Sequence, residues 1–151
     1  IAIEKLIQIG MPYLKKAGLK DSTAPDVIKR IIALEQPRLK TLSELPEKVG
    51  YFFMQPEYNA QLLIWKSMTA EEVKQSLDVS LTLLEQHHER SIAEIETIFL
   101  ERAAVTGDRG ELLWPLRVAL TGKKNSPGPF DIISIFGIDE AIKRLRIAKN
   151  K

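Results

Sequence analysis

The sequence predicts an all-α protein. Apolar residues recur at helical spacing through most of the 151 residues, and two capping motifs of the form S/T-x-x-E precede such stretches. No stretch of six residues alternates convincingly between apolar and polar side chains, and the β-branched residues also sit at helical spacing. We therefore expect a helical bundle, built from one core or from two small helical subdomains.

Helices in the first part of the chain are predicted from apolar stripes bounded by glycine and proline. Residues 2–17 carry such a stripe, and Gly18 can end the helix in the left-handed conformation. Pro12 is expected to bend or restart this helix, because proline lacks the N–H donor and clashes with the preceding turn. Pro25 suits the first turn of a second helix. After further short segments, residues 58–65 are expected to form another short helix.

Capping boxes mark the starts of the two strongest helices. Thr69 with Glu72, and Ser91 with Glu94, each pair an N-cap hydroxyl with a carboxylate three residues later. Apolar helical periodicity follows both motifs, and the second helix should stop near Gly107.

The last part of the chain is predicted to contain three shorter helices. Pro115 is expected to start the first and Gly122 to end it, residues 129–136 form the second, and the third begins near Asp139. An internal boundary is expected at residues 55–69, where short segments replace long periodicity. We expect one subdomain at residues 1–66 and a second at residues 67–151.

Composition is typical of soluble globular proteins. Hydrophobic residues make up 44% and charged residues 28%, and no run approaches the roughly 20 apolar residues that span a bilayer. Cysteine is absent, so the sequence favours a reducing cytoplasm and offers no thiolate metal site. The chain begins at Ile1 within helical periodicity, without Met or a signal pattern. We expect a piece of a longer protein that is a monomer and does not contact a membrane.

No pattern for catalysis or metal binding is present. The sequence has no GxSxG, Walker, GxGxxG or zinc spacing. His87 and His88 are adjacent, so on a helix they would point about 100° apart and could not share a metal. We expect no catalytic residue, no metal site and no cofactor in this chain.

Positive charge gathers in the C-terminal third. Residues 101–151 carry a net charge of +4 and the first hundred residues −2. Within residues 109–124 the net charge is +3, from Arg109, Arg117, Lys123 and Lys124 against one glutamate. A polyanion should therefore meet this part of the chain, where Arg109, Lys123 and Lys124 are candidate phosphate contacts.

The loop KKNSPGP, residues 123–129, combines these cations with rigid backbone. Its prolines restrict the loop before any ligand arrives, and it exposes lysines, an amide, a hydroxyl and backbone N–H groups. Such a loop could bind splayed bases of single-stranded RNA. The residues alone favour an ordinary solvated corner between two helices, with RNA binding as the alternative.

Two segments resemble a known family. The run WPLRVALTG at 114–122, followed by SPGPF at 126–130 and GIDEAIKRL at 137–145, closely resembles the C-terminus of bacterial-type glutamyl-tRNA synthetases. The segment PRLKTLSELPEKVGYFF at 37–53 is similar to that family's RxKTLxEL segment, in the same order and at about the same separation.

The resemblance implies an α-helical cage that forms the anticodon-binding region, with glutamate tRNA as its partner, and it leaves glutamine tRNA open as a second partner. It also implies that glutamate, ATP and Mg²⁺ bind a catalytic Rossmann domain of the parent ligase. Neither the HIGH-like nor the KMSKS-like motif of that domain occurs in this sequence.

The resemblance also implies roles for individual residues, through the positions at which they match the family's pattern. Arg117 would contact the first anticodon base, Ser126 and Pro127 the middle base, and Pro129 with Phe130 the surface beside them.

The match also has departures. Pro129 stands where relatives often have Leu, and Trp114 replaces a commonly polar residue. Arg38 falls near the family's determinant for the third anticodon base, although Pro37 beside it is unusual.

A different class of function stays open from the residues. The apolar side chains at Trp65 and Tyr51–Phe53 could form a patch for a protein partner, which would make the chain a helical interaction domain. Packing inside the protein is the simpler role for these aromatic residues.

Overall fold

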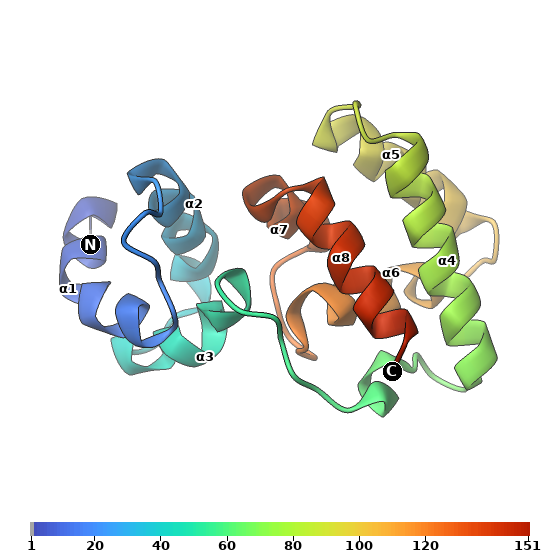
Figure 1. Ribbon diagram of the computed structural model, residues 1–151, viewed down its shortest axis with the longest axis horizontal. Helices are drawn as coiled ribbons and strands as arrows, with labels where there is room; N and C mark the ends of the chain where they lie inside the picture. Colours follow the sequence, from blue (N-terminus) through green and yellow to red (C-terminus); the bar gives the residue numbers. More distant parts are fainter. Residues whose placement is uncertain (1) are drawn as a thin grey trace. The chain divides into compact units, whose positions relative to one another are not determined.

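The computed structural model describes residues 2–151, and these residues form helices and connecting loops without any strand. This confirms the all-α prediction. The α-helices are α1 (Ile3–Lys16), α2 (Pro25–Glu35), α3 (Leu45–Val49), α4 (Ala70–Gln86), α5 (Ile92–Ala104), α6 (Gly110–Thr121), α7 (Pro129–Phe136) and α8 (Ile138–Lys149) (Figure 1). Four 3₁₀ helices are η1 (Gln36–Arg38), η2 (Leu42–Glu44), η3 (Gly50–Phe52) and η4 (Ala60–Leu63).

The chain divides into two compact units, residues 1–56 and 57–151. The expected boundary at 66/67 lies ten residues later along the chain. Residues 57–66 fall within the second unit because the Trp114 indole Nε1 donates to the Leu62 carbonyl at 2.8 Å and the Trp65 ring packs on the Trp114 ring. The segment expected to be a short helix at 58–65 is instead η4, flanked by extended residues.

The first unit packs α1, α2 and α3 around a small core. Its fully buried side chains are Leu14, Ile31, Ile32, Leu45 and Val49. Pro12 does not interrupt α1, which runs unbroken to Lys16, so the expected restart there is wrong. Gly18 follows with a φ of 107°, which is the positive value that glycine adopts most readily.

The second unit places α8 against α4 and α6, and α7 against α5, α6 and α8 (Figure 1). Both predicted capping boxes are confirmed. The Thr69 hydroxyl accepts from the Glu72 N–H at 3.1 Å while the Glu72 carboxylate accepts from the Thr69 N–H at 3.0 Å. Ser91 and Glu94 make the same reciprocal pair at 3.2 and 3.4 Å. No helix in residues 2–151 is both long and apolar enough to cross a membrane.

Pro115 lies inside α6, so the prediction that it starts this helix is wrong. The helix begins five residues earlier, at Gly110. In a regular helix the N–H of residue 115 would donate to the carbonyl of Glu111, and proline removes that donor. The Ser76 hydroxyl of α4 donates to this carbonyl instead, at 2.7 Å. A side chain from a neighbouring helix therefore satisfies the acceptor that proline leaves open.

Candidate nucleic-acid interface

The loop between α6 and α7 begins with a tightly closed turn. Gly122 has a φ of 67° and its N–H donates to the Val118 carbonyl at 2.7 Å, which confirms that this glycine ends the helix in the left-handed conformation. The Thr121 hydroxyl donates to the Arg117 carbonyl at 2.9 Å and accepts from the Lys123 N–H at 3.1 Å. The first residues of the loop are thus fixed by contacts within a few positions.

Arg117 joins α6 to the loop. Its Nη2 donates to the Lys124 carbonyl at 3.1 Å, and its Cζ lies 5.2 Å from the centroid of the Trp114 ring. The side chain is half-buried, one helical turn beyond Trp114 on the same helix. The guanidinium is therefore held against an aromatic face and a loop carbonyl.

Two residues near the far end of the loop are buried rather than exposed. Ser126 and Pro127 are buried, and the Ser126 hydroxyl donates to the Pro127 carbonyl at 2.9 Å. Gly128 is exposed and Pro129 half-buried at the start of α7. The loop consequently offers backbone and the Pro129 ring at its surface, while Ser126 supports its shape from within.

Phe130 does not form the surface that the sequence suggested. The ring is 6% exposed and packs edge-on against Phe99 of α5, with centroids 5.3 Å apart. As the second residue of α7 it is carried into the core together with Ile132 and Ile133. Phe130 therefore fixes the position of α7 beneath the loop.

The candidate phosphate contacts fall into two places. Lys124 is exposed and Lys123 half-buried, and both belong to the loop. Arg109 is exposed at the opposite end of α6, where it is the N-cap residue. Twelve residues of helix put Arg109 roughly 18 Å from the loop, so it can meet only a different part of a long polyanion.

A buried arginine of α8 supports the last turn of α6, directly before the loop. The Arg144 side chain of α8 is 3% exposed. Its Nη1 donates to the Leu120 carbonyl at 2.7 Å, its Nε donates to Glu140 at 2.8 Å, and its Cζ lies 4.5 Å from the Phe136 ring centroid. The only sequence signal was the i,i+4 spacing of Glu140 and Arg144, which surface pairs share.

In the first unit, Arg38 is the last residue of η1. Its Nε donates to Glu35 at 3.2 Å, and the Glu35 side chain is 2% exposed. The Arg38 side chain itself is about one-third exposed. Glu35 therefore holds the partly exposed Arg38 guanidinium through its Nε.

The two histidines do not form a metal site. The His88 Nε2 lies 2.7 Å from Asp139 and its Nδ1 3.3 Å from Glu89. Hydrogen bonds to Asp139 first, and to Glu89 second, raise the pKa of the His88 imidazole. Among residues 2–151 no group of three or more His, Asp or Glu side chains could hold a metal ion.

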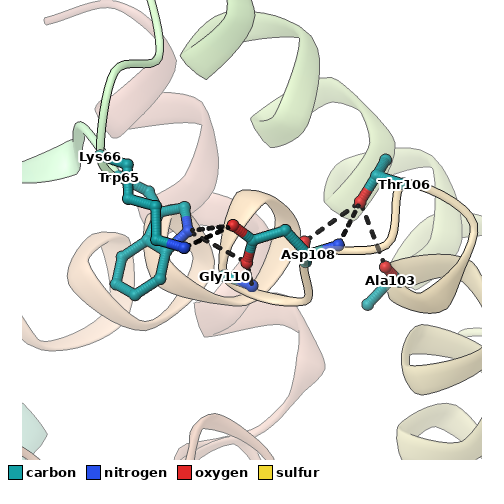
Figure 2. Close-up of polar contacts among 6 residues, drawn as sticks. All are labelled: Trp65, Lys66, Ala103, Thr106, Asp108 and Gly110. Atoms are coloured by element: carbon teal, nitrogen blue, oxygen red, sulfur yellow. Dashed lines mark hydrogen bonds and ion pairs between the residues drawn. The ribbon is translucent and has the colours of Figure 1, made fainter.

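The aromatic residues considered for a protein-binding patch are engaged in packing. Tyr51 is 4% exposed. Trp65 is half-buried, with its ring centroid 5.4 Å from that of Trp114. The indole Nε1 of Trp65 lies 3.2 and 3.1 Å from the two carboxylate oxygens of Asp108 (Figure 2).

Comparisons with known proteins agree over nearly the whole chain. A glutamate–tRNA ligase from Lachnoclostridium phytofermentans is 32% identical over 98% of this chain, and one from Clostridium tetani is 34% identical over 99%. The chain spans about 30% of the length of these relatives.

The fold is shared with solved structures. The crystal structure of a glutamate tRNA ligase from Elizabethkingia meningosepticum, in complex with its amino acid, matches all of this chain with a TM-score of 0.78 at 21% identity. The match covers 30% of that protein. The family profile described as "Anticodon binding domain" matches residues 5–149, and the chain belongs to this family.

Proposed function

We propose that this chain is the anticodon-binding region of a glutamate–tRNA ligase and that its own task is to hold glutamate tRNA. The observation that carries the proposal is similarity to such ligases over 98% of the chain, together with a loop that is ordered by its own contacts. Activation of glutamate with ATP and Mg²⁺ belongs to the rest of the parent enzyme.

The anticodon loop would bind across α6, the 122–128 loop and the start of α7. In this proposal Arg117 contacts the first anticodon base, and the backbone around Ser126 and Pro127 contacts the middle base, with the Pro129 ring beside it. Base edges of an unstacked loop offer the hydrogen-bonding groups that these donors and acceptors can pair with. The Phe130 ring acts from below, by fixing α7.

Cations supply the part of the affinity that does not depend on base sequence. Lys123 and Lys124 belong to the 122–128 loop and would contact anticodon phosphates, whereas Arg109 would meet RNA further along. Arg38, in the first unit, would contact the third anticodon base. Whether glutamine tRNA is also bound depends on how strictly Arg38 distinguishes the third anticodon base of the two tRNAs.

Binding of glutamate tRNA to the chain at several salt concentrations tests the proposal. Neutralising about three phosphates gives a slope of about −2 in a plot of log affinity against log salt, at roughly −0.7 per phosphate for single strands. A protein-interaction domain would show no binding, or a weak association equal for every RNA. The proposal fails if glutamate tRNA and an unrelated tRNA bind equally.

A further inference from the structure

Resting on this proposed function, we propose that Trp114 is a positioning residue for anticodon recognition, which holds the Arg117 guanidinium for the RNA and is itself held by the Asp108 cluster. The Asp108 cluster is defined as Trp65, Lys66, Thr106, Asp108 and Gly110 (Figure 2).

The first step is the contact between Trp114 and Arg117. The guanidinium Cζ lies 5.2 Å from the Trp114 ring centroid, while the Arg117 Nη2 donates to the Lys124 carbonyl at 3.1 Å. A long arginine side chain loses much rotamer freedom when it binds a ligand. A ring under its face restricts that freedom before the RNA arrives, so less entropy is lost on binding.

The second step is that Trp114 cannot move freely. Its indole Nε1 donates at 2.8 Å to the carbonyl of Leu62, a residue of η4. The Trp65 ring packs on it with an interplanar angle of 36°. Both contacts come from the segment that precedes α4, about fifty residues away in the sequence.

The third step is the Asp108 cluster that holds Trp65. The Asp108 carboxylate accepts from the Trp65 indole, from the Lys66 Nζ at 3.0 Å and from the Gly110 N–H at 3.0 Å (Figure 2). Gly110 is required there, because a Cβ at this position would overlap the Trp65 indole. The Thr106 hydroxyl lies 3.1 Å from the Asp108 carbonyl and fixes the turn.

The backbone of Lys66 adopts an unfavourable conformation that helps to form the Asp108 cluster. Lys66 has a φ of 52°, and it is the one residue other than glycine with positive φ among residues 2–151. Lysine is unfavourable in this region of conformational space, and such residues persist where surrounding contacts fix them. Here the unfavourable backbone brings the Lys66 ammonium and the Trp65 indole to one carboxylate.

A double-mutant cycle on the full 151-residue chain tests the proposal. The probe is a synthetic anticodon stem–loop RNA with the glutamate anticodon. Trp114→Leu should weaken binding about two- to fivefold when Arg117 is present, which is the range of an exposed cation–π contact. In the Arg117→Ala background the same change should have almost no further effect. If the fold-losses in RNA affinity of the two single variants multiply in the double variant, the two residues act independently and Trp114 does not position Arg117.

Two further variants separate positioning from folding. Trp114→Phe keeps a ring under Arg117 and should recover most of the affinity lost in Trp114→Leu. Trp65→Phe keeps the stacked ring but loses the donor to Asp108, and it should weaken binding less than Trp114→Leu. If Trp114→Leu does not fold, Trp114→Phe and Trp65→Phe replace it in the cycle, each measured with Arg117 and with Arg117→Ala. The proposal is overturned if the fold-losses in RNA affinity of the single variants multiply in the double variant.

A measurement without RNA tests the positioning of Arg117 by Trp114 separately from the proposed RNA-binding function. The Arg117 Nε–Hε signal in an NMR spectrum of the unbound chain should be shifted by the Trp114 ring and should lose that shift in Trp114→Leu. A shift that stays the same would overturn the positioning of Arg117 by Trp114. Failure of the unchanged chain to bind the stem–loop would refute the proposed function, whereas binding with multiplying losses would refute only the role of Trp114.

Discussion

The two ends of α6 are held in different ways. At its C-terminal end, Thr121 and Gly122 bond to residues within four positions, and Arg144 is the distant side chain that reaches the last turn. At its N-terminal end, Asp108 binds Trp65 and Lys66, more than forty residues away. The loop end is therefore built mainly by local sequence, and the opposite end by a contact between distant segments.

This difference indicates which mutations should act locally and which should act over the whole unit. A change in the turn at Gly122 disturbs the loop and leaves distant contacts in place. A change in the Asp108 cluster loosens η4 from α6. Arg144 is the exception at the loop end, because it joins α8 to α6 through a buried side chain.

The largest loss of stability is expected when Arg144 is replaced. Arg144→Met would leave the Leu120 carbonyl without its donor and remove the partner of Glu140, at a cost of about 3 kcal/mol in the free energy of unfolding. Urea denaturation measures this loss. Arg146→Met is the matched control, since Arg146 is exposed and pairs with Glu85 at the surface, where such pairs contribute less than about 1 kcal/mol. Equal losses in both variants would contradict a special role for Arg144.

The sequence predicted the local features of the fold well. The capping boxes at Thr69 and Ser91 and the helix end at Gly122 depend on residues within four positions, so their patterns determine the outcome. Pro115 was misplaced because its tolerance within α6 depends on the Ser76 hydroxyl of another helix. No local pattern carries that information.

The candidate site shows the same limit. The positions of glycine and proline predicted the loop, and the net positive charge of residues 109–124 predicted its cations. The family resemblance adds which of these residues are proposed to face RNA. Burial of Phe130 and Arg144 could not be predicted, because each is determined by helices packed against it. The stack of Trp65 on Trp114 likewise joins segments that no periodicity relates.

The N-terminal end is tested most directly at Gly110. Gly110→Ala places a methyl group where the Trp65 indole lies, so the ring must move away from Asp108. Overpacking of this kind costs about 1–3 kcal/mol, and we expect about 2 kcal/mol in urea denaturation. Gly128→Ala is the control, because its nearest neighbour would lie at an ordinary 3.6 Å. If the loss at Gly110 persists unchanged in a Trp65→Leu background, contact with Trp65 is not its cause.

At the C-terminal end, Gly122→Ala should cost less. The backbone there has a φ of 67°, where a Cβ is disfavoured by about 1 kcal/mol. Gly122→Asn should lose less than Gly122→Ala, because asparagine tolerates this conformation better. Thermal melting of both variants tests the ranking, and a larger loss at Gly122 than at Gly110 would reverse the proposed contrast between the two ends.

The smallest expected effect is the pH dependence of the Asp108 cluster. Hydrogen bonds from Lys66 first, and from Trp65 second, lower the pKa of the Asp108 carboxyl. A carboxyl whose pKa is lower in the folded state contributes stability above its unfolded pKa of about 3.9, and this contribution is lost as the pH falls through the folded-state pKa. The cluster should therefore weaken below about pH 4 and be insensitive to pH between 6 and 8.

Asp108→Asn separates this carboxyl from the other acids that titrate in the same range. Asparagine resembles the protonated acid, so the variant should be slightly less stable than the unchanged chain at pH 7, and the difference should narrow as the pH falls below about 4. Tryptophan fluorescence reports on the cluster directly, because Trp65 belongs to it and Trp114, the other tryptophan of the sequence, stacks on Trp65. A stability difference that stays constant from pH 7 to pH 3 would show that the charge of Asp108 contributes nothing. The N-terminal end of α6 would then be held by contacts that do not need this charge, among them the packing of the two indoles and the hydrogen bond from Trp114 to the Leu62 carbonyl.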